Sequence, residues 1–191
     1  MSVPLASARH DGAMIEVELV PATGSDDATL MERITVLINE VYAVAEEGVW
    51  IDGATRTTVD RVAELTRAGQ IAVARLRARI VGCVRIQRLD EVTGEFGMLA
   101  ADPGHRGVGV GRELVRFAER RCREDGLSTM QLELLVPRAW KHPTKEFLAA
   151  WYTRLGYRVA RTGTIDAAYP QLAPLLATPC DFVTYRKELA A

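Results

Sequence analysis

Hydrophobic and polar residues follow two different periods along the first third of the chain. Residues 14–20 alternate apolar side chains with glutamates, a pattern that is typical of a strand with one solvated face. Residues 30–41 repeat apolar side chains at helical spacing, and the next glycine is Gly48, so a helix is expected to end near that residue. A shorter helix is expected over 58–68.

The middle of the chain changes to short segments rich in branched side chains. The segments 70–76, 80–89 and 95–101 have the composition of strands, and residues 90–94 have that of a turn. These features predict a meander of antiparallel strands. The turn at 77–79 contains neither glycine nor asparagine, although these are the usual residues of tight hairpin turns.

Strands and helices alternate in the last third. A loop-like segment, 102–111, leads into an amphipathic helix that stops at Gly126. A strand, a helix and two more strands are expected next, over 130–136, 144–155, 157–162 and 182–187. This order predicts an α/β fold in which helices cover the faces of a mixed sheet.

Composition and charge narrow the classes of function. The 191 residues suit one domain, which we place at 14–191 behind a flexible N-terminus at 1–13. The net charge of −1 does not favour nucleic acid or an anionic membrane as partner. Three cysteines without a CxxC pair, and the lack of a signal-peptide pattern, favour the cytoplasm. The three histidines have no metal-ligand spacing, so no metal is expected.

The strongest chemical signal is the segment Arg106-Gly107-Val108-Gly109-Val110-Gly111, between a predicted strand and a predicted helix. Glycines let backbone N–H groups face a ligand without a side chain in the way. The start of the helix adds unpaired N–H groups and a positive dipole end, so the segment suits a pyrophosphate. Arg106 and Arg112 can add charge-assisted hydrogen bonds. The alternative is a tight turn that binds no ligand.

Two better-known phosphate motifs do not fit this segment. The dinucleotide fingerprint needs a glycine where Arg112 or Leu114 stands, and the nucleoside-triphosphate loop needs a lysine that is absent. A nucleotide-binding domain of another fold would require parallel strands, whereas the turn before Glu95 favours antiparallel neighbours.

Three segments together resemble the GCN5-related N-acetyltransferases, the GNAT family. Residues 106–111 resemble its R-x-x-G-x-G/A signature, residues 94–103 its fourth strand, and residues 151–157 its x-Tyr-x-x-Leu-Gly-Phe segment. They occur in the family's order over about residues 70–162. The resemblance implies a GNAT-like mixed, mostly antiparallel sheet of six to seven strands with helices on both faces.

The resemblance also implies acetyl-CoA as co-substrate. In the family, the pyrophosphate binds the amides that match 108–111, and the pantetheine arm runs beside the strand that matches 98–101. An exposed strand edge can accept such an extended, amide-bearing ligand. The cofactor-binding residues implied by this match are Leu99, Ala100, Ala101, Arg106, Gly107, Val108, Gly109, Val110, Gly111 and Arg112.

The reaction implied is direct attack of a primary amine on the thioester in a ternary complex. An alkyl amine has a pKa near 10.4, so it needs a base at neutral pH. Glu95 is the candidate, since an alternating strand puts it on one face with Gly97 and Leu99; the alternative is an exposed residue after a turn. A main-chain N–H near Leu99 would bind the oxyanion. Tyr152 matches the family's general acid, although it also fits an apolar helix face.

The acceptor side carries weaker signals. Glu47 and Trp50 lie in the loop after the first predicted helix, where charge and cation–π contact would suit a cationic amine; a frayed helix end is the alternative. Lys145 stands where many family members have asparagine, and we expect a solvated helix-start residue. The acceptor, acyl chain and oligomeric state stay open, a homodimer being the commonest assembly. A non-catalytic acyl-CoA sensor is the alternative function.

Overall fold

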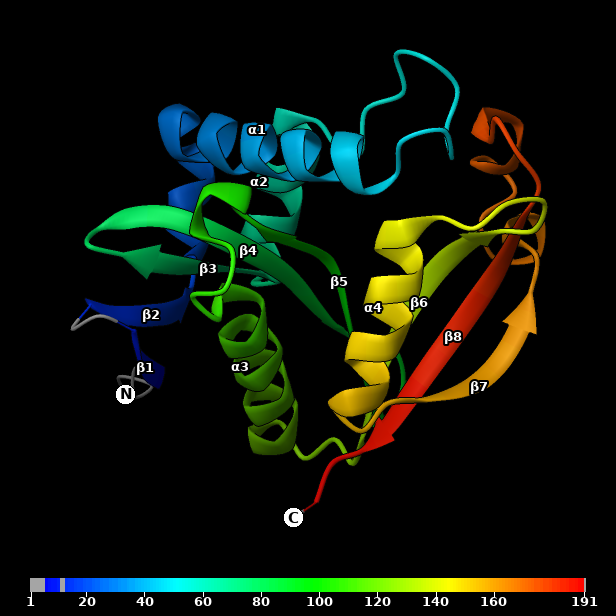
Figure 1. Ribbon diagram of the computed structural model, residues 1–191. Coiled ribbons are helices and arrows are strands. Elements are labelled where there is room, and N and C mark those ends of the chain that lie inside the picture. Colours follow the sequence, from blue (N-terminus) through cyan, green and yellow to red (C-terminus); the bar gives the residue numbers. More distant parts are fainter. Residues whose placement is uncertain (1–5, 11–12, 191) are drawn as a thin grey trace.

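The computed structural model of the chain describes residues 6–10 and 13–190. One mixed sheet runs through it in the order β1-β2-β3-β4-β5-β6-β8-β7 (Figure 1). Neighbouring strands are antiparallel except β5 and β6, which are parallel. The mixed, mostly antiparallel sheet is therefore confirmed. The strands are β1 (Ala6–His10), β2 (Ala13–Leu19), β3 (Ile71–Leu76), β4 (Arg79–Arg88), β5 (Thr93–Ala101), β6 (Thr129–Pro137), β7 (Arg158–Gly163) and β8 (Cys180–Glu188).

The sheet has eight strands, one more than the six to seven expected. The additional strand is β1, which falls inside the segment 1–13 that we expected to be flexible. It pairs antiparallel with β2 at the edge of the sheet, because edge backbone groups readily accept another strand. The rest of the expected flexible segment, residues 1–5 and 11–12, lies outside the described residues.

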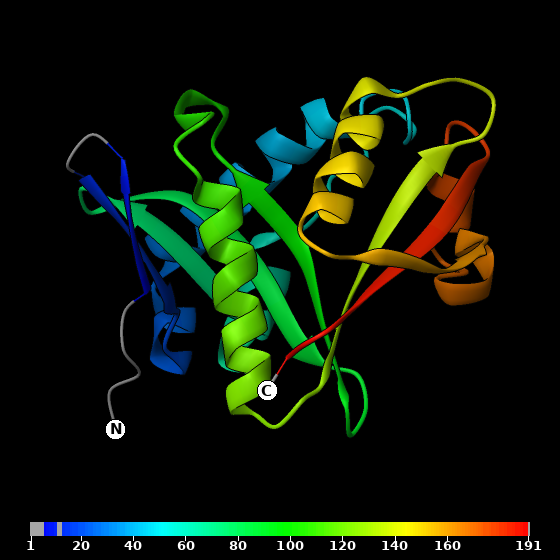
Figure 2. The same cartoon turned by 60° about the horizontal axis from the view of Figure 1, so that its bottom comes forward.

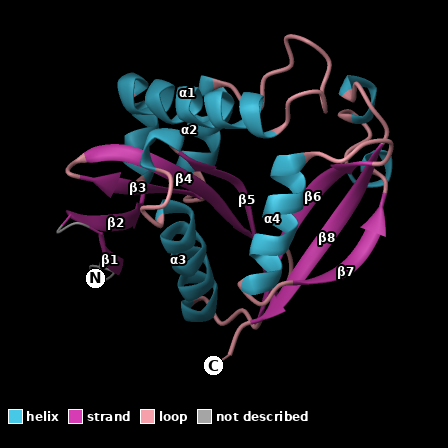
Figure 3. Cartoon of the chain, in the orientation of Figure 1, coloured by secondary structure: helices cyan, strands magenta, loops and turns pink. Residues whose placement is uncertain are grey.

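Helices cover both faces of the sheet, as expected (Figures 2 and 3). One face carries α1 (Ala28–Ala45) and α2 (Val59–Arg67). The buried Ile34 and Ile38 of α1 share a core with Cys83 of β4. The other face carries α3 (Val110–Glu124) and α4 (Pro143–Arg154). A short α5 (Ile165–Ala168) precedes β8. No helix in the described part of the chain is long and apolar enough to cross a bilayer.

The hairpin between β3 and β4 closes through an unusual turn. Arg77 and Ala78 both have left-handed backbone, with φ of 49° and 64°. Two successive positive φ angles are what a twisted two-residue hairpin turn requires. Side chains with a Cβ adopt this region at a cost, which glycine or asparagine would reduce.

A bulge at Met98 interrupts the alternation of β5. Met98 has a φ of 48°, and the pairing with β4 shifts so that Met98 and Leu99 together oppose a single residue. As a result Met98 packs in the core under α1, whereas Leu99 packs on the α3 side. The predicted common face of Glu95, Gly97 and Leu99 is therefore wrong, because the extra residue reverses the alternation after Gly97.

Strands β5 and β6 separate soon after they meet. They pair only over Thr93–Glu95 and Thr129–Gln131, whereas both strands continue for six further residues, to Ala101 and Pro137. From Phe96 onward the β5 edge that faces β6 has no strand partner in the described chain. This opening places a cavity in the middle of the sheet.

Candidate active site

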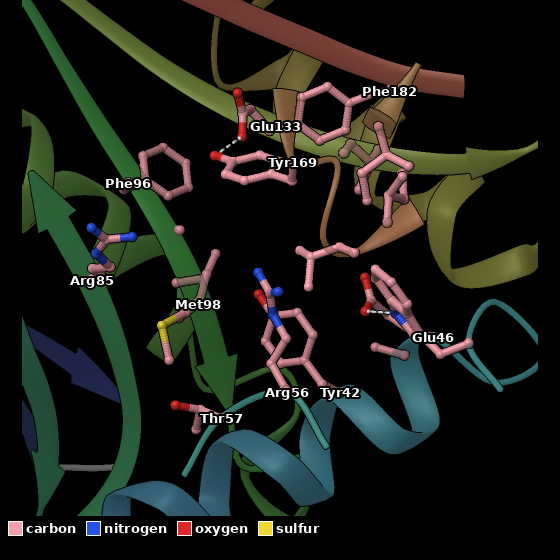
Figure 4. A pocket seen from close by; sticks show the side chains of 18 of the residues that line it. Tyr42, Glu46, Arg56, Thr57, Arg85, Phe96, Met98, Glu133, Tyr169 and Phe182 are labelled. Carbon is pink, nitrogen blue, oxygen red and sulfur yellow. Dashed lines mark hydrogen bonds between the residues drawn. The ribbon is translucent and has the colours of Figure 1, made fainter. Parts of the chain in front are cut away.

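A cavity of about 360 Å³ lies at the opening between β5 and β6. Side chains from α1, α2, the loop between them, four strands and α4 line it, and the segment after α5 closes one side (Figure 4). Glu95, Leu99 and Tyr152 all line this cavity. The structure thus brings together both predicted catalytic residues and one predicted main-chain contact.

Glu95 is buried, at 8% exposure, rather than an exposed residue after a turn. Its Oε1 accepts a hydrogen bond from Nε2 of Gln87 at 2.7 Å, and its Oε2 accepts one from Nε2 of Gln131 at 3.1 Å. The two glutamines accept in turn from Arg85 and Arg186. Because an ionised carboxylate offers about four acceptor positions, two remain for a ligand.

Tyr152 reaches the cavity from the opposite face of the sheet. Its ring packs beside Phe96, at 6.0 Å between centroids, and Phe96 points away from Glu95 because successive strand residues alternate. The residue is 6% exposed, and its hydroxyl has no hydrogen-bond partner among the described residues. Burial raises the pKa of Tyr152 well above its ordinary value, so the phenol keeps its proton.

A second carboxylate in the cavity, Glu133 of β6, was not among the predicted site residues. It accepts a hydrogen bond from the Tyr169 hydroxyl at 2.9 Å (Figure 4). Burial, and then the charge of Glu95, raise the pKa of Glu133. The available signal was an acidic residue in the middle of an otherwise apolar strand pattern, where alternation places it on one face with Gln131.

The predicted acceptor residues divide between two environments. Trp50 lines the cavity and donates from Nε1 to Glu46 at 2.6 Å, whereas Glu47 is exposed and does not line it. Glu46 also pairs with Lys145 at 2.6 Å. Lys145 is therefore a buried partner of Glu46, and the expected solvated helix-start residue is wrong. Lys145 neutralises Glu46, and Glu47, which we predicted for the acceptor, lies outside the cavity lining.

The glycine loop meets the start of α3. Gly107 and Gly109 have φ of 83° and 96°, and no described residue accepts a hydrogen bond from either N–H. The first helical amides, Val110 to Arg112, precede the first α-helical bond, from Glu113 to Gly109, and lack partners within the helix. Two other loop amides, those of Arg106 and Val108, bond to carbonyls of the preceding turn.

Strand β5 connects the cavity lining with the glycine loop. Ala100 and Ala101 lead from Leu99 at the cavity toward the loop, and the side chains of Arg106 and Arg112 are exposed beside it. The helix start also approaches α4, since a Cβ built on Gly111 would lie 3.5 Å from the Trp151 ring. The strand that lines the cavity therefore continues to the loop that carries the free amides.

Solved structures with the same architecture are known. One is yncA from Salmonella typhimurium, described as a putative acetyltransferase with its cofactor acetyl-CoA: 16% identity, TM-score 0.63, 93% of this chain and 95% of that one covered. Ard1 from Thermoplasma volcanium is similar at 15% identity and TM-score 0.62, over 93% and 99% of the chains. An N-acetyltransferase from Staphylococcus aureus Mu50 is similar at 14% identity and TM-score 0.63, over 92% of this chain and 99% of that one. At these identities the likeness shows a common fold.

Sequence comparison defines the family. No curated protein sequence matches the chain. A family model described as an acetyltransferase (GNAT) domain matches residues 67–159, which contain β3 to β6, α3, α4 and the glycine loop. The family match confirms the resemblance found in the sequence: residues 67–159 belong to the GNAT acetyltransferase family, and the solved structures share the fold.

Proposed function

We propose that the protein transfers an acetyl group from acetyl-CoA to a primary amine by direct attack within a ternary complex. The observation that carries this proposal is the placement of Glu95 and Tyr152 in one cavity at the gap between β5 and β6. A base and an acid that approach the same gap from opposite faces suit a reaction in which one proton leaves the nucleophile and another reaches the leaving group.

Acetyl-CoA is proposed to bind along the path from the loop to the cavity. The free amides of the glycine loop and the first turn of α3 would hold the pyrophosphate. Arg106 and Arg112 would add charge. The unpaired edge of β5 at Leu99–Ala101 would pair with the pantetheine amides as a strand does. An acetyl-CoA-bound structure of the same fold, yncA, supports this assignment.

The chemical step needs one proton removed and one supplied. Glu95, directly or through water, would accept a proton from the ammonium of the acceptor, and the free amine would attack the thioester carbon. A main-chain N–H near Leu99 would stabilise the oxyanion, a contribution worth about 3 kcal/mol in related chemistry. The C–S bond then breaks, Tyr152 would protonate the thiolate, and the second proton of the former amine nitrogen would return to Tyr152, directly or through water.

Acetyl-CoA turnover tests the proposal directly. The purified protein is incubated with acetyl-CoA and a panel of primary amines, and free thiol is measured with a chromogenic reagent. Thiol release that depends on an amine is expected. Calorimetry with CoA measures binding separately, and a protein that binds no CoA would contradict the proposal.

The alternative is an acyl-CoA sensor that binds the coenzyme without chemistry. Tyr152→Phe and Glu95→Gln separate the two functions, because both substitutions conserve shape. An enzyme should lose about 100-fold or more in kcat through either change while CoA affinity is kept. A sensor would show no amine-dependent thiol release in any form, and unchanged CoA binding.

A further inference from the structure

The cationic side chains around the cavity are not all paired directly with carboxylates. Four cationic side chains and three carboxylates line it. Lys145 pairs with Glu46 at 2.6 Å, and Arg61 pairs with Glu64, outside the lining, at 2.9 Å. The two remaining cations, Arg56 and Arg85, have no carboxylate within 4.0 Å in the part of the chain that the structure describes.

Arg85 is held in place by neutral groups. Its Nε donates to Oε1 of Gln70 at 2.8 Å, and its Nη2 donates to Oε1 of Gln87. Glu95 is connected to Arg85 through Gln87 rather than by direct contact. Burial, and then the charge of Arg61, lower the pKa of Arg85. A guanidinium that is fixed and partly desolvated, and that has no direct carboxylate partner, is well placed to bind an anionic group of a ligand.

Arg56 reaches the same space from the loop before α2. Its guanidinium lies over the ring of Tyr42, 5.0 Å from the ring centroid. Figure 4 shows Arg56 directed into the cavity from the α1 side and Arg85 from the β4 side, with Glu133 and Tyr169 on another wall. The two arginines and the carboxylates Glu95 and Glu133 therefore line one cavity.

Resting on the acetyltransferase function proposed above, we infer that the acceptor is a small amine that also carries a carboxylate, bound by Arg56 and Arg85. A carboxylate matches the planar, multiple-donor geometry of guanidinium groups. The ammonium end is then directed to Glu95 and Glu133. A cavity of about 360 Å³ suits a molecule of amino-acid size. A plain polyamine would bring two or more ammonium groups toward two arginines that have no direct carboxylate partner.

Matched acceptors test the inference with the intact protein. Thiol release is measured for the L-amino acids, for the carboxamide of each, and for the amine that remains when the carboxylate is removed. The best carboxylate is expected to exceed its carboxamide in kcat/KM by about 10- to 100-fold, the range for hydrogen bonds to a charged group. Equal rates, or a preference for the decarboxylated amine, a polyamine or a peptide N-terminus, would overturn the inference and leave the acetyltransferase function standing.

Arginine variants locate the effect. Arg85→Gln and Arg56→Gln should each raise KM for the carboxylate acceptor about 10-fold more than KM for its carboxamide, so the preference shrinks. Arg61→Gln is the matched control, because Arg61 lines the cavity but pairs with Glu64; the preference should persist. A preference that survives both arginine substitutions would contradict the assignment.

A binding measurement keeps the inference testable without turnover. If no amine releases thiol, calorimetry of the CoA-saturated protein with the N-acetyl amino acids and their carboxamides decides it. Binding of a carboxylate that is lost in Arg85→Gln supports the site, and absence of any carboxylate binding overturns it. Absence of thiol release with CoA binding intact would instead refute the proposed catalysis.

Discussion

The ammonium of Lys145 lies 2.6 Å from Oε1 of Glu46, and the side chains are 3% and 10% exposed. The pair joins the first turn of α4 to the residue that follows α1. Trp50 donates to the other oxygen of the same carboxylate. Two helices from opposite faces of the sheet are thus linked at the border of the cavity by one buried ion pair.

Lys145→Met should destabilise the protein by about 3 kcal/mol, because the substitution leaves the Glu46 carboxylate buried without its partner. The free energy of unfolding is measured in urea. Lys141→Met is the matched control, since Lys141 is exposed and its distance to Glu146 is 3.8 Å; little change is expected there. Equal, small effects of the two substitutions would contradict a structural role for the buried pair.

Glu46 should make stability depend on acidic pH. Burial alone would raise the pKa of Glu46, but the charges of Lys145 and Arg56 and the hydrogen bonds outweigh it and lower the pKa below 4.5. A depressed folded-state pKa gives stability that is present above about pH 4.5 and lost as pH falls through the folded value. Urea unfolding from pH 7 to pH 3 measures this loss. In Glu46→Gln the free energy of unfolding should depend less on pH in this range. The same dependence in the variant and the original protein would contradict the role of Glu46.

Glu133→Gln should raise stability at pH 7 while lowering turnover. The pKa of Glu133 is raised by burial and by Glu95, so its contribution to stability is present below about pH 4.5 and lost as pH rises through the folded value. Glutamine does not ionise, so the substitution removes the stability that is lost when Glu133 ionises, and its amide oxygen still accepts from the Tyr169 hydroxyl. Thermal melts at pH 4 and pH 7, beside thiol-release rates, measure both effects. Lower stability at pH 7 would contradict the expected direction.

Gly109→Ala should cost about 1–2 kcal/mol of stability and weaken CoA binding, because Gly109 has a φ of 96° that an L side chain rarely adopts. Nothing lies within 4 Å of a Cβ built there, so the effect is one of backbone conformation. For Gly111→Ala, the control, φ is ordinary and the added Cβ makes normal contact with Trp151. Its stability should be kept. Denaturant unfolding and CoA calorimetry compare the two.

Ala78→Gly should stabilise the protein by about 0.5 kcal/mol. The left-handed φ of 64° at Ala78 costs about 1–2 kcal/mol for a residue with a Cβ, and the greater freedom of glycine in the unfolded chain offsets part of the gain. Ala150→Gly, at an exposed position within α4, is expected to lose about 1 kcal/mol instead. The opposite signs are checked by urea unfolding, and a loss in both would contradict the turn assignment.

Local patterns in the sequence predicted most of the framework. The glycines of the loop, the apolar stripe of α3 and the alternation of β2 are each properties of a few neighbouring residues. The order of the elements then predicted the mixed sheet. Glu95 was chosen from the alternation of its strand and Tyr152 from the family resemblance, and both residues line one cavity.

The features that the sequence did not predict depend on residues far apart in the chain. The pairing of Lys145 with Glu46 spans 99 positions, and no local pattern reports such a contact. The bulge at Met98 arises from the pairing of β5 with β4, and nothing in its residue type requires a positive φ. Glu133 lines the cavity beside Tyr169, its hydrogen-bond partner, which lies 36 positions away in the chain.

The narrow connection between β5 and β6 has a consequence for motion. Three residue pairs join these strands, whereas nine join β6 to β8. The sheet therefore consists of two extensively paired halves that are joined by few β5–β6 pairs, and both halves contribute walls of the cavity. Small rotations of one half against the other would widen or narrow the space around the reacting groups. An extended coenzyme that pairs with the β5 edge would restrict such rotations.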